Sequence, residues 1–203
     1  MTFTTDRRLV RMREVLDQRI HHVSVAIEAL YHRHNVSAVL RTVDSLGLHR
    51  VHLVEGHFRA VRGAARGAER WLELHHHPDP TTAIRAIQAS GYRVWCADLA
   101  EDAVTPEELP LDEPVCIWFG AELVGVSPAA REACDGVVTV PMRGFAQSLN
   151  VSVAAALTLR PVAERARLLG DKALLPPDER EELWKAWLER EEVKHLRGRP
   201  RPR

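Results

Sequence analysis

The chain has 203 residues, of which 45% are hydrophobic, so it is long enough to form one medium-sized domain around a substantial apolar core. Its 28 basic and 28 acidic residues cancel, so overall charge gives no sign of a nucleic-acid partner, and no apolar run approaches the roughly 20 residues of a membrane span. The N-terminus is charged where a signal peptide is apolar, and the three cysteines are isolated in apolar stretches, which predicts a cytoplasmic protein with reduced cysteines.

Apolar residues follow two different periods along the chain, and the two periods alternate. Alternating or short unbroken apolar runs indicate strands, whereas apolar residues three and four positions apart indicate amphipathic helices. Glycines and capping residues mark several of the helix ends. After a basic helix within 1–20, we predict strands over 21–30, 50–55, 71–76, 92–99, 114–120 and 136–142, and helices over 35–47, 81–91, 127–135, 147–170 and 177–196.

The alternation predicts an α/β fold in which helices cover both faces of a mostly parallel sheet, with short helical extensions at both ends. Ligands of such sheets bind beyond the carboxyl ends of the strands. Three segments follow strands at that edge: one after Ala97, one over 119–125 (FGAELVG) and one over 141–150 (PMRGFAQSLN). We therefore expect these three segments to form one pocket.

The third of these segments has an unusual composition. Gln147, Ser148 and Asn150 place three polar side chains where an apolar helical stripe begins, although one capping residue would be enough for the first turn. Pro141 and Gly144 precede them, as expected of a loop. We interpret the stretch as a loop shaped to hold a ligand, followed by a helix that begins at Gln147.

Motifs for several other activities do not match this sequence. FGAELVG lacks the GxGxxG spacing and GxxxxGK[ST] does not occur, which argues against dinucleotide-binding and P-loop sites. His75, His76 and His77 are adjacent, so they would alternate between the two faces of a strand, and we expect no metal site. Ser148 lacks the Gly-x-Ser-x-Gly setting of an esterase nucleophile.

Three segments, taken together, resemble the conserved motifs of the SPOUT-class RNA 2′-O-methyltransferases. Their order and spacing also agree, and the resemblance covers roughly residues 20–165. The basic N-terminal helix and the Trp-containing C-terminal helix resemble the ends of the TrmH subgroup, the tRNA guanosine-18 methyltransferases. The three segments are NVSAVLRT (35–42), FGAELVGVS (119–127) and VPMRGFAQSLNVSVAAAL (140–157).

The resemblance implies a fold and a domain organisation that the patterns alone do not show. It implies a deep trefoil knot in the C-terminal half of the α/β domain, threaded around the cofactor loops, and a homodimer that forms through the helix after Asn150. The implied division is a basic helix over 1–20, a knotted methyltransferase domain over 21–165, and a C-terminal helix with a basic tail over 166–203.

The implied activity is methyl transfer from S-adenosylmethionine to the ribose 2′-hydroxyl of guanosine 18 in the tRNA D-loop. The family assigns the central role to Arg41, held by Asn35, which we expect at the N-cap of its helix. A guanidinium keeps its proton above pH 12, so neutralising the developing alkoxide or gripping a phosphate suits Arg41 better than acting as a base. Glu122 accepts the proton, orients the target or caps a loop, and these alternatives stay open.

The site residues implied by the resemblance fall into two sets. Residues near the catalytic centre come from the first, second and third motifs, and residues around the cofactor come from the three loops at the sheet edge. The catalytic set is Arg41, Asn35, Glu122, Ser148 and Asn150, and the cofactor-binding set is Ala97, Leu99, Gly120, Val140, Met142 and Leu149.

Charge is unevenly distributed even though it sums to zero. Arginines gather in the N-terminal helix, in 56–70 and in the tail KHLRGRPRPR, whereas residues 98–113 are acidic. This segregation predicts a basic face that contacts tRNA phosphates, with patches from both protomers of a dimer serving one tRNA. The predicted RNA-binding residues are Arg8, Arg11, Arg59, Arg62 and Arg66.

Two alternative functions compete with this one. The same chemistry could act on ribosomal RNA or on another tRNA position. Relatives that modify ribosomal RNA often carry a separate N-terminal RNA-binding domain, and only about 20 residues precede the first predicted strand, which favours tRNA. A non-catalytic RNA-binding relative is the alternative of another class, and the intact catalytic set argues against it.

Overall fold

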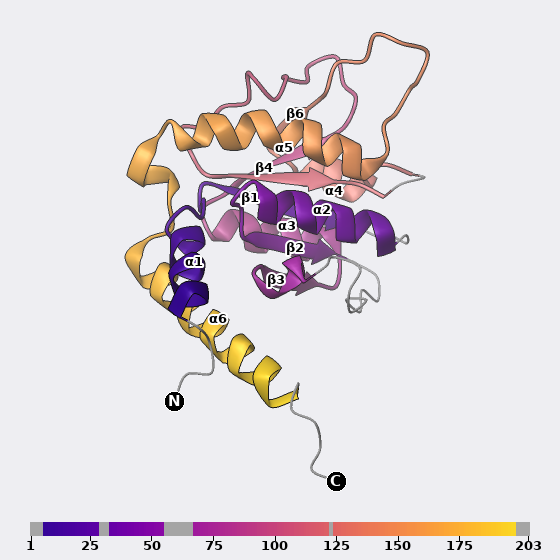
Figure 1. Ribbon diagram of the computed structural model, residues 1–203. Coiled ribbons are helices and arrows are strands. Elements are labelled where there is room, and N and C mark those ends of the chain that lie inside the picture. The colour runs from indigo at the N-terminus through magenta and orange to yellow at the C-terminus, as the bar shows by residue number, and fades with distance from the viewer. Residues whose placement is uncertain (1–5, 29–32, 55–66, 122–123, 198–203) are drawn as a thin grey trace.

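A computed structural model of the chain describes residues 6–28, 33–54, 67–121 and 124–197. Glu122 and the loop arginines Arg59, Arg62 and Arg66 therefore lie outside the described residues. Figure 1 shows a central sheet between layers of helices, with α1 and α6 packed together to one side of it. The helices are α1 (Asp6–Leu16), α2 (Arg33–Ser45), α3 (Pro80–Ala89), α4 (Pro128–Ala133), α5 (Val151–Arg167) and α6 (Pro177–Arg197).

The described residues contain six strands in one sheet, in the order β3-β2-β1-β5-β4-β6, and every neighbouring pair is parallel. The central strands β1 and β5 are buried along their whole length, which explains the unbroken apolar run of β5. The strands are β1 (Val23–Glu28), β2 (Arg50–Val54), β3 (Glu73–His77), β4 (Arg93–Ala97), β5 (Val115–Phe119) and β6 (Gly136–Val138).

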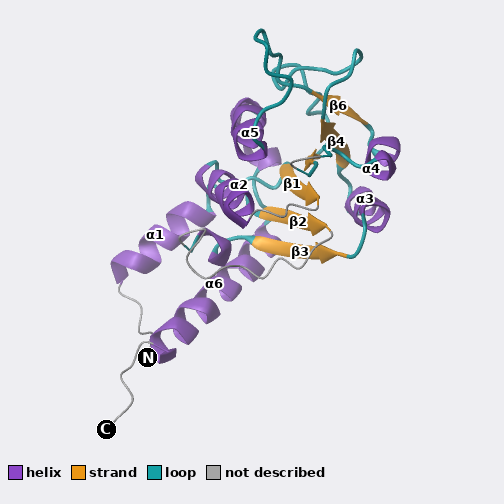
Figure 2. Ribbon diagram, turned by 90° about the vertical axis from the view of Figure 1, so that its right-hand side faces the viewer, coloured by secondary structure: helices purple, strands orange, loops and turns teal. Residues whose placement is uncertain are grey.

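Helices cover both faces of the sheet, as predicted. Figure 2 shows α2 and α5 against one face and α3 and α4 against the other. The two apolar cores follow this division: Val39 and Leu159 pack on the α2 and α5 side, and Ile84 and Ala130 on the other side. The short helix α4 begins as predicted, because the Ser127 hydroxyl accepts a hydrogen bond from the Ala130 amide at 3.2 Å.

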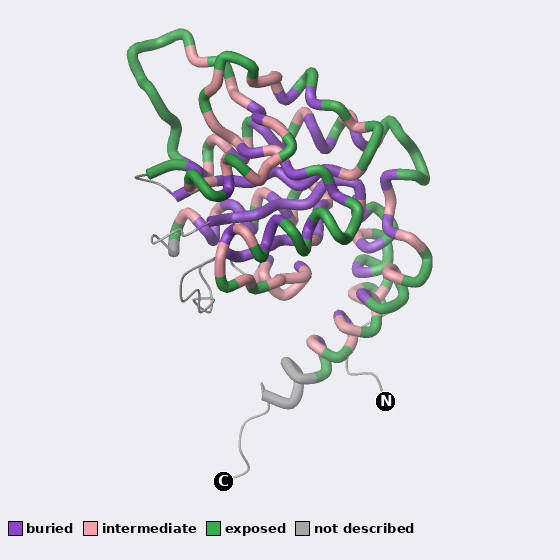
Figure 3. The backbone as a smooth tube through the Cα atoms, turned by 180° about the vertical axis from the view of Figure 1, so that it is seen from behind, coloured by how far each residue is buried: buried purple, intermediate pink, exposed green. Residues whose placement is uncertain are grey.

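A third, smaller core joins the two ends of the described chain. Met12 and Leu16 of α1 pack against Leu183 and Trp187 of α6. Figure 3 shows buried stretches alternating with exposed ones along the helices near the two ends of the chain. At the same junction the carboxylate of Glu191, which is 1% exposed, accepts hydrogen bonds from Arg8 at 2.6 Å and from Arg70 at 2.9 Å. The terminal helices are therefore held to each other and to the region before β3.

Several predicted boundaries are wrong. α2 begins at Arg33, so Asn35 lies inside its first turn and is not the N-cap. α5 begins at Val151, with Asn150 as its N-cap, so the helix does not start at Gln147. The reason is that the Asn150 side chain accepts a hydrogen bond from the Ser152 amide at 2.9 Å, which stops the helix from extending backwards. The other strands and helices differ from the predictions by a few residues.

Candidate functional site

A cavity of about 500 Å³ opens at the carboxyl ends of β4, β5 and β6. The three segments predicted to converge all contribute to its wall: the residues after Ala97, the residues that follow Phe119, and the exposed loop between β6 and α5. All six predicted cofactor-binding residues line it, namely Ala97, Leu99, Gly120, Val140, Met142 and Leu149.

The second of these segments is a tight turn held by its own backbone. The Ala121 amide donates to the Gly125 carbonyl at 2.8 Å, and the Gly125 amide donates back to the Ala121 carbonyl at 2.9 Å. Gly125 has φ +70°, a left-handed conformation that favours glycine. Gly120 packs so closely on this turn that a Cβ there would lie 2.2 Å from the Gly125 carbonyl carbon.

Gly120→Ala should therefore damage the cavity wall. Because the added methyl group meets backbone and not a flexible side chain, the turn has to move, and we expect affinity for the ligand of this cavity, which the motif resemblance implies is S-adenosylmethionine, to fall about tenfold or more. Isothermal titration calorimetry measures this directly. Gly144→Ala is the matched control, since a Cβ at that exposed position meets nothing within 4 Å. Equal affinities for both variants would contradict the prediction.

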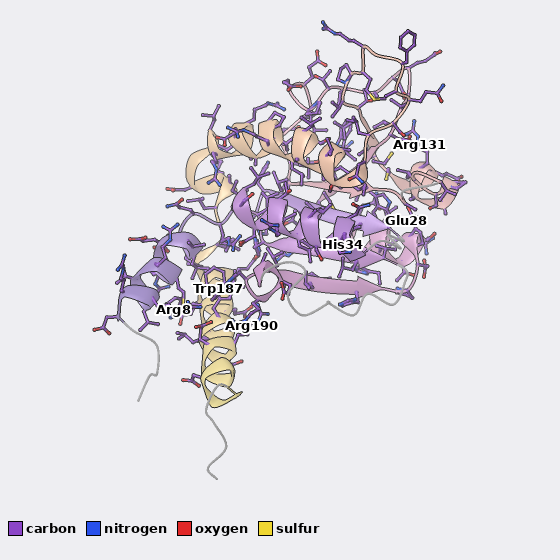
Figure 4. The ribbon with its side chains drawn as sticks, turned by 45° about the vertical axis from the view of Figure 1, so that its right-hand side comes forward. Arg8, Glu28, His34, Arg131, Trp187 and Arg190 are labelled. Atoms are coloured by element: carbon purple, nitrogen blue, oxygen red, sulfur yellow. The ribbon has the colours of Figure 1, made fainter. Side chains whose placement is uncertain are left out.

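Glu28 forms hydrogen bonds on both sides of the turn that follows β5. The sequence patterns did not identify this residue. Its buried carboxylate accepts a hydrogen bond from Trp118 Nε1 at 2.9 Å, just before the turn, and another from the Ser127 amide at 3.2 Å, just after it. Figure 4 shows Glu28 at the end of β1 that faces the cavity edge of the sheet. An acidic residue at the end of an otherwise apolar strand is the signal that could have found it.

Two amide side chains meet at the wall of the cavity. Asn150 Nδ2 donates a hydrogen bond to Asn35 Oδ1 at 3.2 Å, while Asn150 Oδ1 caps α5. This contact joins the first and third predicted motifs, which are 115 residues apart. Ser148 is exposed in the adjoining loop and also lines the cavity, so the structure brings Asn35, Ser148 and Asn150 together.

Arg41 is not among the residues that line this cavity. It lines a separate cavity of about 520 Å³ beside Gly67, Ala68 and Trp71, on the outer side of α2. The reason is helical geometry: six residues at roughly 100° each place Arg41 about 120° around the helix from Asn35. The structure therefore brings together three of the predicted catalytic residues and leaves Arg41 apart, while Glu122 lies outside the described residues.

The two described arginines of the predicted RNA-binding set lie on α1. Arg8 is tied to Glu191, and its guanidinium stands 5.8 Å from the centre of the Trp71 ring. Arg11 is exposed and pairs with Glu14 at 3.1 Å, a contact that contributes little to stability. Both side chains are on the surface side of the α1 and α6 junction, where a phosphate could compete for them.

Three histidines form a cluster that becomes visible only once β2 and β3 are paired. The Nδ1 atom of His52 lies 3.0 Å from the Nε2 atom of His77, and its ring stacks on His75 with centroids 5.1 Å apart. Burial, together with these neighbouring histidines, lowers the pKa of His52 to about 3. In the described part of the chain, no three His, Cys, Asp or Glu side chains are arranged to hold a metal ion.

The described helices also lack the length and apolarity required to cross a membrane. The structure contains no disulfide among Cys96, Cys116 and Cys134, which all lie in its described part. The features that point to a function are the cavity at the sheet edge, the separate Arg41 cavity and the arginines of α1.

Comparison with known proteins places these features in a family. The model of the SpoU rRNA Methylase family matches residues 22–160. The tRNA (guanosine(18)-2′-O)-methyltransferase of Thermus thermophilus is 38% identical over 189 residues, which is 91% of this chain and 97% of that protein. The crystal structure of the A. aeolicus TrmH/SpoU tRNA modifying enzyme has 28% identity and a TM-score of 0.81, covering 91% of this chain and 96% of that one.

A more distant structure shares the fold. The SpoU methyltransferase AviRb from Streptomyces viridochromogenes, in complex with the cofactor AdoMet, is 23% identical with a TM-score of 0.65, and the match covers 77% of this chain and 65% of that one. The family match contains all three segments around the cavity as well as the Asn35–Asn150 contact. The chain therefore belongs to the SpoU family of RNA methyltransferases.

Proposed function

We propose that this chain transfers a methyl group from S-adenosylmethionine to the ribose 2′-hydroxyl of guanosine 18 in the tRNA D-loop. The observation that carries the proposal is the 38% identity to the Thermus thermophilus enzyme of that name, over almost the whole length of both proteins. The similarity covers 91% of this chain and so extends beyond the family match over 22–160. A tRNA substrate implies a cytoplasmic enzyme.

The cavity at the sheet edge suits the proposed methyl donor. Its volume of about 500 Å³ lies in the usual range of roughly 300–1,000 Å³ for small-molecule sites. Leu99, Val140 and Leu149 offer apolar surface to the adenine, and the turn around Gly120 brings main-chain groups close. Bound there, S-adenosylmethionine supplies an electrophilic methyl group on a sulfonium.

Methyl transfer then requires that the hydroxyl be aligned with the methyl group and lose its proton. The linked amides of Asn35 and Asn150 are placed to orient the ribose, and Ser148 adds a hydroxyl beside them. Asp98 is a lining carboxylate that sequence patterns missed; it already accepts a hydrogen bond from the Leu99 amide at 2.8 Å. We assign Arg41 one of two roles, to grip a tRNA phosphate or to neutralise the developing alkoxide. We assign the role of proton acceptor to no residue.

The position of Arg41 supports a homodimer whose active site is shared. Arg41 and the Asn35–Asn150 pair line different cavities of one protomer, so a site that contains all three needs a second chain. The outer face of α5 offers an apolar surface for it: Val153 is 45% exposed and Leu157, one turn later, is 48% exposed.

A double variant tests this interface. We expect V153E/L157E to be monomeric by analytical ultracentrifugation and inactive, because two carboxylates would be buried without partners. Val10→Glu introduces one such charge at an exposed apolar position on α1, where Val10 is 58% exposed, and should remain dimeric. A dimeric V153E/L157E protein would contradict the proposed use of α5.

We extend the proposal to the topology and to the ends of the chain. The parallel order of β5, β4 and β6, and the return of α5 onto α2, support a trefoil knot over the C-terminal part of 21–165. The separate core between α1 and α6 supports treating 1–20 and 166–203 as additions to that domain. Arg8, Arg11, Arg59, Arg62 and Arg66 are proposed to contact tRNA phosphates, with no metal required for catalysis.

Mass-spectrometric mapping of methylated nucleotides tests the function. Transfer RNA from a strain that lacks the gene should lose 2′-O-methylguanosine from the D-loop, and expression of the chain should restore it. The purified protein should methylate unmodified tRNA in the presence of a chelator, provided that tRNA folding is held constant. Methylation restored to ribosomal RNA, or to another tRNA position, would select the alternative substrate.

A further inference from the structure

A second, smaller cavity adjoins the Arg41 cavity, and no step of the proposed reaction uses it. It has a volume of about 230 Å³, lies between α1, α2 and α6, and shares Trp71 and Asp44 with the Arg41 cavity. Figure 4 shows Arg8 and Trp187 where α1 meets α6. Because Trp71 and Trp187 line it, we name it the tryptophan cavity.

The size and the walls of the tryptophan cavity suit one flat ring system. Its volume is several times the roughly 30 Å³ of a water molecule but below the roughly 300 Å³ of a site for a larger ligand. The rings of Trp71 and Trp187 meet edge to face with centroids 5.1 Å apart, and Met12 and Val15 complete the apolar part of the wall. Aromatic side chains of this kind stack on the bases of RNA.

Two buried donors in the wall have no acceptor. Among the described side chains, Trp187 Nε1 and Arg19 Nε make no hydrogen bond, although Trp187 is 1% exposed and Arg19 is 0% exposed. Buried donors are normally satisfied, and a ligand that carries acceptors would satisfy this pair, which belongs to two residues of the cavity wall.

A carboxylate lies beside these donors. Asp44 Oδ1 accepts a hydrogen bond from Arg19 Nη2 at 2.5 Å, which holds the side chain in place. The Asp44 side chain is still 30% exposed and lines the cavity, so the carboxylate keeps acceptor capacity for a ligand. Arg8 and Arg11 also line the tryptophan cavity and supply positive charge suited to a phosphate.

We propose that the tryptophan cavity binds a guanine base, and that its source is the tRNA, in which case the inference rests on the proposed function. Guanine carries the acceptors O6 and N7, which match Trp187 Nε1 and Arg19 Nε, and the donors N1–H and N2–H, which match the Asp44 carboxylate. Adenine carries an amino donor in place of the O6 acceptor, so a donor would face the donors of Trp187 and Arg19. Adenine also has no N2 amine to donate to the Asp44 carboxylate. The cavity therefore selects guanine by polarity as well as by shape.

Titration of the full-length protein with GMP and with AMP tests the base preference. The indole N–H signals of ¹⁵N-labelled protein should show that GMP shifts the Trp187 resonance and that AMP does not. Trp187→Phe keeps the aromatic ring and removes the donor, and Asp44→Asn keeps an acceptor for Arg19 but removes the carboxylate. Each should weaken GMP binding about tenfold.

Matched controls come from the same helices of the terminal core. Trp184→Phe alters a tryptophan that is packed against Arg13 and does not line the cavity, and Asp17→Asn alters a half-exposed carboxylate paired with Arg180. Both should bind GMP like the unsubstituted protein. Equal binding of GMP and AMP, or unchanged GMP binding in both cavity variants with native spectra, would overturn the proposal.

Competition with tRNA identifies the source of the base. If the guanine comes from tRNA, unmodified tRNA should displace GMP, and Trp187→Phe should raise the KM for tRNA more than it lowers kcat. GMP that stays bound beside tRNA would indicate a free-nucleotide site and overturn the tRNA assignment. A failure of methylation by the unsubstituted protein would refute the proposed function alone, since GMP binding is measured without methyl donor.

Discussion

Arg41→Ala should lower kcat for tRNA methylation by a factor of about 10²–10³, the usual cost of losing a preorganised charge that stabilises the transition state. Affinity for S-adenosylmethionine should change little, because Arg41 is assigned to a tRNA phosphate or to the developing alkoxide and is not among the residues that line the cofactor cavity of its own chain. Arg41→Lys should restore little activity, since an ammonium cannot reproduce the planar two-pronged grip of a guanidinium. Single-turnover rates and donor titrations measure the two effects separately, and near-normal turnover of Arg41→Lys would refute the bidentate role.

Mixed dimers show whether Arg41 acts across the interface. Homodimers of Arg41→Ala and of Asn150→Ala should both be inactive. In a heterodimer that carries one change on each chain, a shared site would leave one of the two sites intact, so about half of the normal activity should return. If both residues came from the same protomer, each site would carry one substitution and the heterodimer would stay inactive. The separation of the two cavities predicts recovery.

Acid should destabilise the folded chain through two buried histidines. Burial lowers the pKa of His49 and of His52 from 6.5 to about 3, with Arg50 adding to the effect on His49 and His75 and His77 adding to that on His52. Below pH 6.5 the unfolded chain therefore binds protons that the folded chain does not, so stability is complete above pH 6.5 and falls as the pH drops. Each histidine contributes about 1.4 kcal/mol per pH unit, or about 4 kcal/mol for the pair between pH 8 and pH 5.

Chemical denaturation at several pH values measures this slope. His52→Gln should remove about half of it, because one of the two titrating groups is lost. His76→Gln changes the exposed histidine of the same strand pair and should leave the slope as it was. Below about pH 4.5, Glu73 adds to the loss, since its hydrogen bond with His75 and the charge of Arg50 lower its pKa to about 2. A stability that does not change between pH 8 and pH 5 would contradict the assignment.

Periodicity was sufficient to predict the order of the elements and the segments that meet at the sheet edge. It placed the start of α5 at Gln147, because apolar spacing does not show which of several polar residues caps a helix, and here the cap is Asn150. It could not show that His52 meets His75 and His77, since that contact depends on the pairing of β2 with β3. Contacts between elements are invisible to a local pattern.

The predicted catalytic residues illustrate the same limit. Their resemblance to known motifs placed Asn35 and Arg41 in one functional unit, and their spacing of six residues already indicates different sides of a helix. The structure adds that Asn35 contacts Asn150, whereas Arg41 faces Trp71. Sequence could not supply this division, because it depends on what packs against each side of α2.

The Glu28 carboxylate has a consequence for how this chain can change during evolution. One of its two donors, the Trp118 indole, disappears when Trp118 is replaced by phenylalanine, and Glu28 still keeps the other. The second donor is the Ser127 main-chain amide, which no substitution can remove except proline. Loss of the Glu28 carboxylate therefore leaves the Ser127 main-chain amide without its hydrogen-bond acceptor, whereas loss of Trp118 does not. Trp118 should consequently vary among relatives while Glu28 stays, so the ends of β1 and β5 should tolerate change at unequal rates.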